Sequence, residues 1–155
     1  MKGIIIIGYQ GIGKSSCAGI DGCIDLESSN FYIDDKRAWD WYKIYCEIAK
    51  DLASQGYTVF ISSHKEVRDY LEGEDNVVVF CPPKRFKLDW IQRLQNRYDK
   101  DSSYKNLKAL KNARERYSDN IRELMDSGFP VYQPDSLTYN LLDYVHQIRE
   151  DLYCN

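Results

Sequence analysis

The feature that most constrains this chain is a run of four isoleucines followed at once by a glycine-rich segment. The stretch "IIIIGYQGIGKSS" places Gly8, Gly13, Lys14 and Ser15 in the spacing G-x-x-x-x-G-K-[ST]. Glycines at such positions let the backbone wrap closely around a phosphate, with its amide groups pointing at phosphate oxygens and a helix start adding its positive dipole end. The lysine then neutralises the phosphates, and the serine hydroxyl holds Mg²⁺. The segment predicts a nucleoside triphosphate site where a buried strand passes into a helix.

The predicted binding set extends through the whole glycine-rich segment. Gly11 serves the same tight turn, and ATP with Mg²⁺ is the expected ligand pair. The residues expected to bind ATP are Gly8, Gly11, Ile12, Gly13, Lys14, Ser15 and Ser16, of which Ser15 is also an expected ligand of the metal.

Short apolar or β-branched segments alternate along the chain with segments of helical periodicity. Strands are expected at residues 3–8, 23–26, 57–62, 76–81 and 130–133. Helices are expected at residues 36–55, 87–98, 104–125 and 137–152. Asp34 and Asp35 suit the start of the first of these helices, and Gly56 suits its end. This alternation predicts an α/β fold with a parallel sheet covered by helices on both faces.

The length of 155 residues fits one domain, 1–155, that buries its own core. Five cysteines, an odd number without a C-x-x-C pair, are expected to be reduced thiols, which indicates a cytoplasmic setting. The apolar runs are far shorter than the ~20 residues of a membrane span, so no membrane association is expected. A net charge of −3 gives no overall attraction to nucleic acid.

On the motif "GYQGIGKS" the chain resembles the P-loop kinase group, which contains nucleoside monophosphate kinases, shikimate kinase and small phage nucleotide-kinase-like proteins. The resemblance implies a three-layer P-loop NTPase fold whose five parallel strands lie in the order 2-3-1-4-5. It also implies a mobile lid after the fourth strand, here a helical region near residues 86–127. The implied activity is transfer of a phosphoryl group from ATP-Mg²⁺.

Other classes with this loop fit the sequence less well. A GTPase switch is disfavoured because the chain has no guanine-reading N-K-x-D and no D-x-x-G after an apolar strand. A motor ATPase needs an acidic residue at the end of the Walker B strand, whereas the third predicted strand ends in Ser62, Ser63 and His64. These three residues remain candidates for binding Mg²⁺-bound water or the acceptor, or for a purely structural role.

Another acidic pair can replace the missing carboxylate. Asp25 and Glu27 lie at the end of the second predicted strand, where alternation points both side chains to the same side. That edge of an open α/β sheet faces the ligand crevice. The pair resembles the D-x-D of shikimate kinase, with Glu in place of the second Asp. Asp25 is therefore an expected metal ligand and catalytic residue, and either carboxylate is a candidate for orienting the acceptor.

Basic residues cluster in the predicted lid. Arg93 and Arg97 project from one face of a helix, and lid arginines of the resembled kinases clamp the donor phosphates. Both are expected catalytic residues beside Lys14 and Asp25. A basic run follows, which can be a solvated helix face or a phosphate-facing surface: Lys105, Lys108, Lys111, Arg114 and Arg116.

The sequence thus predicts an ATP-dependent phosphotransferase that moves the γ-phosphoryl group to a nucleotide or a hydroxyl-bearing small molecule. Two alternatives stay open. The acceptor can be a hydroxyl on DNA, which the acidic composition does not favour. The missing Walker B carboxylate also permits a nucleotide-binding regulator without efficient catalysis. The oligomeric state is left open.

Overall fold

The structure is a computed structural model that describes residues 2–33 and 36–153. One parallel sheet has the spatial order β2 (Cys23–Asp25), β5 (Thr58–Ile61), β1 (Ile4–Gly8), β6 (Val77–Phe80) and β7 (Val131–Tyr132). Numbered along the chain, these strands give the order 2-3-1-4-5, so the predicted sheet is confirmed. The short strands β3 (Tyr32–Ile33) and β4 (Lys36–Arg37) pair with each other in an antiparallel ribbon.

The isoleucine run forms the central strand of the sheet. Ile4, Ile5, Ile6 and Ile7 have no exposed surface, which is typical of a parallel strand covered on both faces. Strand β1 pairs with β5 on one side and with β6 on the other. All residues of these two neighbours are buried as well. The glycine-rich loop, residues 8–15, therefore begins at the middle of the sheet, at its carboxyl edge.

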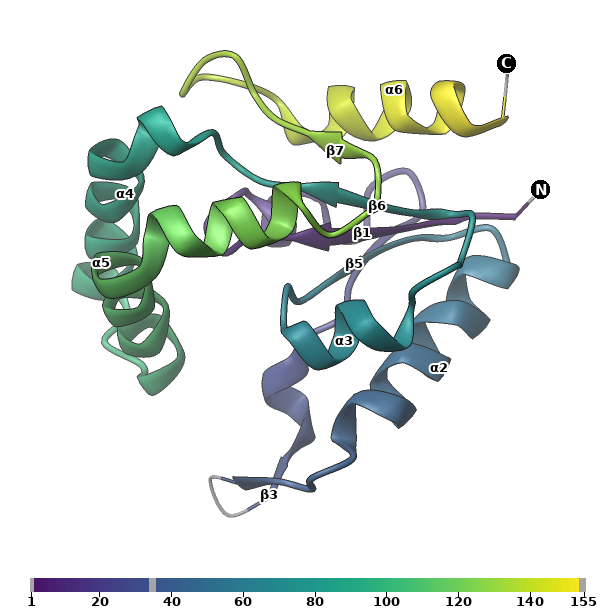
Figure 1. The fold of residues 1–155 in the computed structure, drawn as a ribbon, viewed down its shortest axis with the longest axis horizontal. Helices are drawn as coiled ribbons and strands as arrows, with labels where there is room; N and C mark the ends of the chain where they lie inside the picture. Colours follow the sequence, from purple (N-terminus) through teal and green to yellow (C-terminus); the bar gives the residue numbers. More distant parts are fainter. Residues whose placement is uncertain (1, 34–35, 154–155) are drawn as a thin grey trace.

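Helices cover both faces of the sheet (Figure 1). Helix α6 (Leu141–Tyr153) lies on one face, and α2 (Trp41–Ser54) and α3 (Lys65–Tyr70) lie on the other. Helices α4 (Lys87–Lys100) and α5 (Tyr104–Met125) pack on each other beyond the carboxyl ends of the strands. Two 3₁₀ turns also occur along the chain. Turn η1 (Ser28–Phe31) lies between β2 and β3, and η2 (Lys84–Phe86) directly precedes α4. Among the described residues, no helix has the length and apolar character that a membrane span requires.

The helix predicted at residues 36–55 is wrong at its amino end. Lys36 and Arg37 form β4, because their backbone pairs with β3, and the helix begins at Trp41. Trp39 consequently lies before the helix, with 81% of its surface exposed. The proposed capping role of Asp34 and Asp35 falls outside the described residues. The last helix also begins later than predicted, at Leu141, whereas the expected helix over 104–125 is confirmed.

The helix expected after the glycine-rich loop is very short. Helix α1 (Lys14–Cys17) has four residues, and the chain then turns into β2. Gly19, Asp21 and Gly22 have positive φ angles of 82°, 50° and 73°, which a right-handed helix does not accept. The predicted contribution of a helix dipole to phosphate binding is therefore small, because few peptide dipoles align there.

Four of the cysteines, Cys17, Cys23, Cys46 and Cys81, are buried and free, as predicted for reduced thiols. Cys154 lies outside the described residues. Burial raises the pKa of the Cys46 thiol to about 12 and that of the Cys81 thiol to about 11. These two thiols therefore pack as small apolar groups and are poor nucleophiles near neutral pH.

A buried tyrosine joins two strand ends at the carboxyl edge. The Tyr45 hydroxyl donates to the Leu26 carbonyl at 2.6 Å and accepts from the Ser62 amide at 2.9 Å. Leu26 follows β2 directly and Ser62 follows β5 directly. Helix α2 thus holds the ends of both strands at a fixed spacing.

We expect Tyr45→Phe to lower the free energy of unfolding by about 1–3 kcal/mol, because the part-buried Ser62 amide and Leu26 carbonyl would both lose their partner. Urea denaturation of the purified protein measures this difference. Tyr42→Phe is the matched control on the same helix, since the half-buried Tyr42 makes a ring contact with Tyr70 that phenylalanine keeps. Equal stability of the two variants would contradict the role given to the Tyr45 hydroxyl.

Candidate functional site

A cavity of about 1090 Å³ lies between the glycine-rich loop, the ends of β2 and β5, and the helices α4 and α5. It brings together most of the residues predicted from sequence. The predicted residues in its wall are Gly8, Gly11, Gly13, Lys14, Ser15, Asp25, Glu27, Ser62, Ser63, His64, Arg93, Arg97, Lys105, Lys108 and Arg116. The wall does not include Ile12, Ser16, Lys111 or Arg114.

The glycine-rich loop is held in shape by contacts with distant parts of the chain. Gly11 and Gly13 have φ angles of 86° and 103°, so glycine is the residue that fits there without strain. The Ile12 side chain is buried, and its carbonyl accepts a hydrogen bond from the Tyr139 hydroxyl at 2.8 Å. The Ser16 hydroxyl donates to the Gly13 carbonyl at 2.7 Å. Ile12 and Ser16 thus shape the loop and do not line the cavity, and ATP binding by these two residues stays a prediction.

The Lys14 ammonium lies over the start of the loop. Its Nζ atom is 3.5 Å from the Gly8 carbonyl oxygen. Burial lowers the pKa of Lys14, and the negative charges of Asp25 and Glu27 offset part of that effect. An ammonium that is short of solvent gains most from a bound polyanion, so Lys14 is well placed to hold phosphate.

The acidic pair lies at the end of β2, as predicted. Burial raises the pKa of Asp25; Lys14 opposes this rise and the charge of Glu27 adds to it. Burial is the largest single influence on Glu27 and acts in the same direction, but the hydrogen bond and charge of Lys105, at 2.7 Å, the charge of Lys14 and the hydrogen bond with Asp25 together outweigh it and leave the pKa of Glu27 lowered. Asp25 is thus the member of the pair that takes up a proton more readily.

The donor set near the loop fits a magnesium ion. Among residues 2–33 and 36–153, no three His, Cys, Asp or Glu side chains come together as a metal cluster. Mg²⁺ needs no such cluster, because it keeps several waters and takes substrate phosphate oxygens as ligands. The Ser15 hydroxyl and the Asp25 carboxylate are hard oxygen donors in one cavity wall, so they suit this ion.

The end of β5 presents hydroxyl and imidazole groups in place of a carboxylate. His64 Nδ1 is 2.8 Å from Ser62 Oγ, and the His64 ring makes an edge contact with the Trp41 ring at 5.2 Å. Both polar groups lie in the cavity wall. They can bind water or a substrate hydroxyl there, while the ring contact fixes the imidazole.

Arg93 braces the loop, and the direct phosphate clamp expected from sequence stays a prediction. Its two Nη atoms donate to the Gly11 carbonyl at 3.1 Å and to the Leu137 carbonyl at 3.0 Å. Its guanidinium stacks on the Trp90 ring at 4.0 Å, and Trp90 Nε1 donates to the Gln10 carbonyl at 2.8 Å. Because these contacts engage the guanidinium, they favour a positioning role for Arg93.

The Arg97 guanidinium is held by fewer contacts than the Arg93 guanidinium, so it can more readily contact a ligand in the cavity. Its one hydrogen bond among the described residues runs from Nη2 to Asn106 Oδ1 at 3.3 Å. Arg114, the other arginine considered in this region, donates to Gln95 on α4 and lies outside the cavity wall. Arg97 is therefore the better candidate for contact with a bound phosphate.

Several site residues carry no signal in the sequence. Tyr139 and Trp90 contact the loop across separations of 127 and 80 residues, and no motif marks either one. Arg68 lies on α3, whose six residues are too few to show a helical period. The pairing of Glu27 with Lys105 depends on where α5 begins relative to β2, which only the fold determines.

Comparison of the chain with models of known protein families gives no match, and a search among curated proteins gives none either.

Replacing Arg93 and Arg97 in turn separates the two roles. We expect Arg93→Ala to lower the free energy of unfolding by about 2–4 kcal/mol, because it leaves two carbonyls unpaired and removes a cation–π contact. Arg97→Ala should cost less than about 1 kcal/mol, since it removes one long hydrogen bond. Chemical denaturation measures both changes. A larger loss for Arg97→Ala than for Arg93→Ala would contradict the assignment.

Proposed function

We propose that this chain is an ATP-dependent phosphotransferase of the P-loop kinase type, acting on a nucleotide or another small acceptor. The observation that carries the proposal is the meeting of Lys14, Ser15 and Asp25 in one cavity beside the glycine-rich loop. A phosphate-wrapping loop, a poorly solvated ammonium and two hard oxygen donors are the parts that bind a magnesium-complexed triphosphate.

In this proposal the loop amides and Lys14 hold the β- and γ-phosphates of ATP. Ser15 and Asp25 hold Mg²⁺, which when bound neutralises charge on the phosphate oxygens. An acceptor oxygen forms a bond to the γ-phosphorus while the bond from that phosphorus to the β–γ bridging oxygen breaks, so that ADP leaves. The proton of an acceptor hydroxyl passes to the Asp25–Glu27 pair. Arg97 stabilises charge on the transferring group.

Two features of the cavity help to choose between a small acceptor and a DNA end. Lys100, Lys105 and Lys108 belong to its wall, which favours an acceptor that carries negative charge, including the end of a DNA strand. Lys111 and Arg114 of the same basic run lie outside the wall, so the run is not one continuous strand-binding surface. A small acceptor is therefore preferred over a polynucleotide.

We expect Lys14→Ala to lower the rate of phosphoryl transfer from ATP by at least about 100-fold, because the lost ammonium neutralises the transferring group. The assay follows ADP release with nucleoside monophosphates, nucleosides and oligonucleotide ends as acceptors. Lys111→Ala, an exposed lysine outside the cavity, should leave the rate unchanged. Full activity of Lys14→Ala would refute the kinase. ATP binding without turnover on any acceptor would identify a nucleotide-binding regulator.

The lowered pKa of Lys14 predicts proton uptake when the triphosphate binds. Lys14 has a lower pKa in the protein without nucleotide than it would have beside bound phosphates. At a pH between these two values, a fraction of the nucleotide-free protein carries a neutral Lys14 amine, which binding re-protonates. Uptake should therefore grow as the pH rises toward the ordinary lysine pKa. Calorimetry of ATP-Mg²⁺ binding in buffers of different ionisation enthalpy measures it. Uptake that persists in Lys14→Met would show that another group is responsible.

A further inference from the structure

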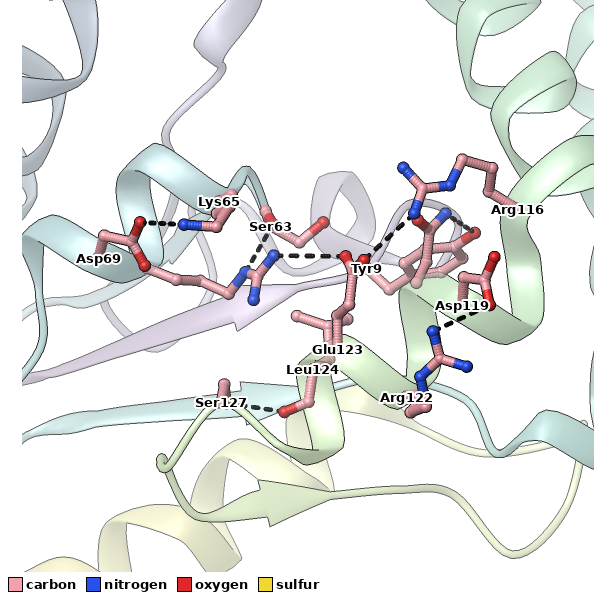
Figure 2. A network of polar contacts seen from close by, with 12 residues as sticks. Tyr9, Ser63, Lys65, Asp69, Arg116, Asp119, Arg122, Glu123, Leu124 and Ser127 are labelled. Atoms are coloured by element: carbon pink, nitrogen blue, oxygen red, sulfur yellow. Dashed lines mark hydrogen bonds and ion pairs between the residues drawn. The ribbon is translucent and has the colours of Figure 1, made fainter.

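Two arginines share one carboxylate in the wall of the cavity (Figure 2). Arg68, on α3, donates from Nε to the Ser63 carbonyl at 3.2 Å, and its Nη2 lies 3.7 Å from Glu123 Oε2. Arg116, on α5, donates from Nη2 to Glu123 Oε1 at 3.2 Å. We call Arg68, Arg116 and Glu123 the arginine cluster. The cluster contains two positively charged guanidinium groups and one carboxylate, so one positive charge is not neutralised within it.

The cluster is built around a guanidinium that is largely removed from water. The Arg68 side chain is 13% exposed, whereas its carboxylate partner Glu123 is 42% exposed and sits at the long end of ion-pair distance. A desolvated guanidinium with such a partner gains from an anion that makes shorter, paired hydrogen bonds. A phosphate group provides this geometry, because its oxygens match the planar fork of arginine.

The cluster lies in the same cavity as the glycine-rich loop. Tyr9 belongs to that loop, and its hydroxyl accepts a hydrogen bond from Asn120 Nδ2 at 3.4 Å. Asn120, like Arg116 and Glu123, comes from α5 and lies in the cavity wall. An anion held by the two arginines would therefore share one cavity with a triphosphate held by the loop.

Helix α5 has a break at the position of one of these arginines. Arg116 has φ −137° and ψ 17°, which are not helical values, although the helix continues on both sides. After the break, Tyr117, Ile121 and Leu124 are anchored in the core. The Arg116 side chain thus extends from the kink in the helix, whereas a hydrogen bond to the Ser63 carbonyl holds Arg68 in place.

We propose that Arg68 and Arg116 form a second anion site, which takes a phosphate carried by the acceptor, and that Glu123 occupies this site as an internal competitor until the acceptor binds. The acceptor is then a phosphomonoester, and this part of the inference rests on the proposed kinase function. Binding of the anion itself does not depend on that function.

The test is a titration of the ¹⁵N-labelled protein with inorganic phosphate, followed by NMR. The Arg68 Nε signal reports the arginine cluster, and the Gly13 amide signal reports the glycine-rich loop. We expect phosphate to shift the Arg68 signal, and Glu123→Gln to tighten that binding by at least about fivefold, the gain when a competing ionic contact is removed. Arg116→Gln should weaken it by a similar factor.

Arg122→Gln is the matched control. Arg122 lies on the same helix and pairs with Asp119 at 3.1 Å, but it is outside the cavity wall. Its replacement should leave phosphate binding at Arg68 unchanged. An Arg68 signal that does not move with phosphate, or a Glu123→Gln protein that binds phosphate no more tightly than the wild type, would overturn the second anion site.

Further titrations identify the source of the phosphate. A nucleoside monophosphate that shifts the Arg68 signal supports a small acceptor, and a 5′-phosphorylated single-stranded oligonucleotide that does so supports a strand end. A nucleoside without phosphate should not shift it; an equal shift would overturn the phosphomonoester assignment. The kinase proposal is tested separately by the Gly13 amide signal. If ATP-Mg²⁺ does not shift that signal, the kinase proposal fails, whatever the result at Arg68.

Discussion

The burial of four consecutive isoleucines in the middle of the sheet is the constraint on which the rest of the structure depends. A strand with no exposed side chain needs a neighbouring strand on each side and helices on both faces, and β5, β6, α2 and α6 supply these. The chain leaves this strand at the carboxyl edge, where the glycine-rich loop must turn sharply. Trp90, Arg93 and Tyr139 then hold the loop through its backbone carbonyls. The loop is thus shaped by packing, since the four-residue helix after it offers little dipole.

Charge is distributed unevenly over the cavity that this loop borders. At one end, Lys14 loses solvent and faces the Asp25–Glu27 pair, which Lys105 also contacts from α5. At another part of the wall, Arg68 and Arg116 share the Glu123 carboxylate. At both places, around Lys14 and around Arg68, the carboxylates of the protein only partly stabilise the positive charge. In our account, donor phosphates and an acceptor phosphate complete these two sets of contacts.

The sheet was predictable from sequence because buried strands and amphipathic helices leave periodic patterns, and the strand order 2-3-1-4-5 followed from the family resemblance. Lys14, Ser15, Asp25 and Glu27 were predictable because their positions follow from the motif and from strand alternation. The bracing role of Arg93 was not, since it depends on carbonyls 82 and 44 residues away. The ribbon of β3 and β4 was missed because Lys36 and Arg37, which favour helices, pair as a strand, an outcome that tertiary context decides.

The most direct test of the central claim is a crystal structure of the protein with Mg²⁺ and an ATP analogue that cannot be hydrolysed between the β- and γ-phosphates. Our account predicts the triphosphate on the loop of residues 8–15, with Lys14 Nζ on its terminal phosphates and the metal on Ser15 Oγ, directly or through water on Asp25. A triphosphate bound away from this loop, or a loop that stays empty at saturating nucleotide, would contradict it.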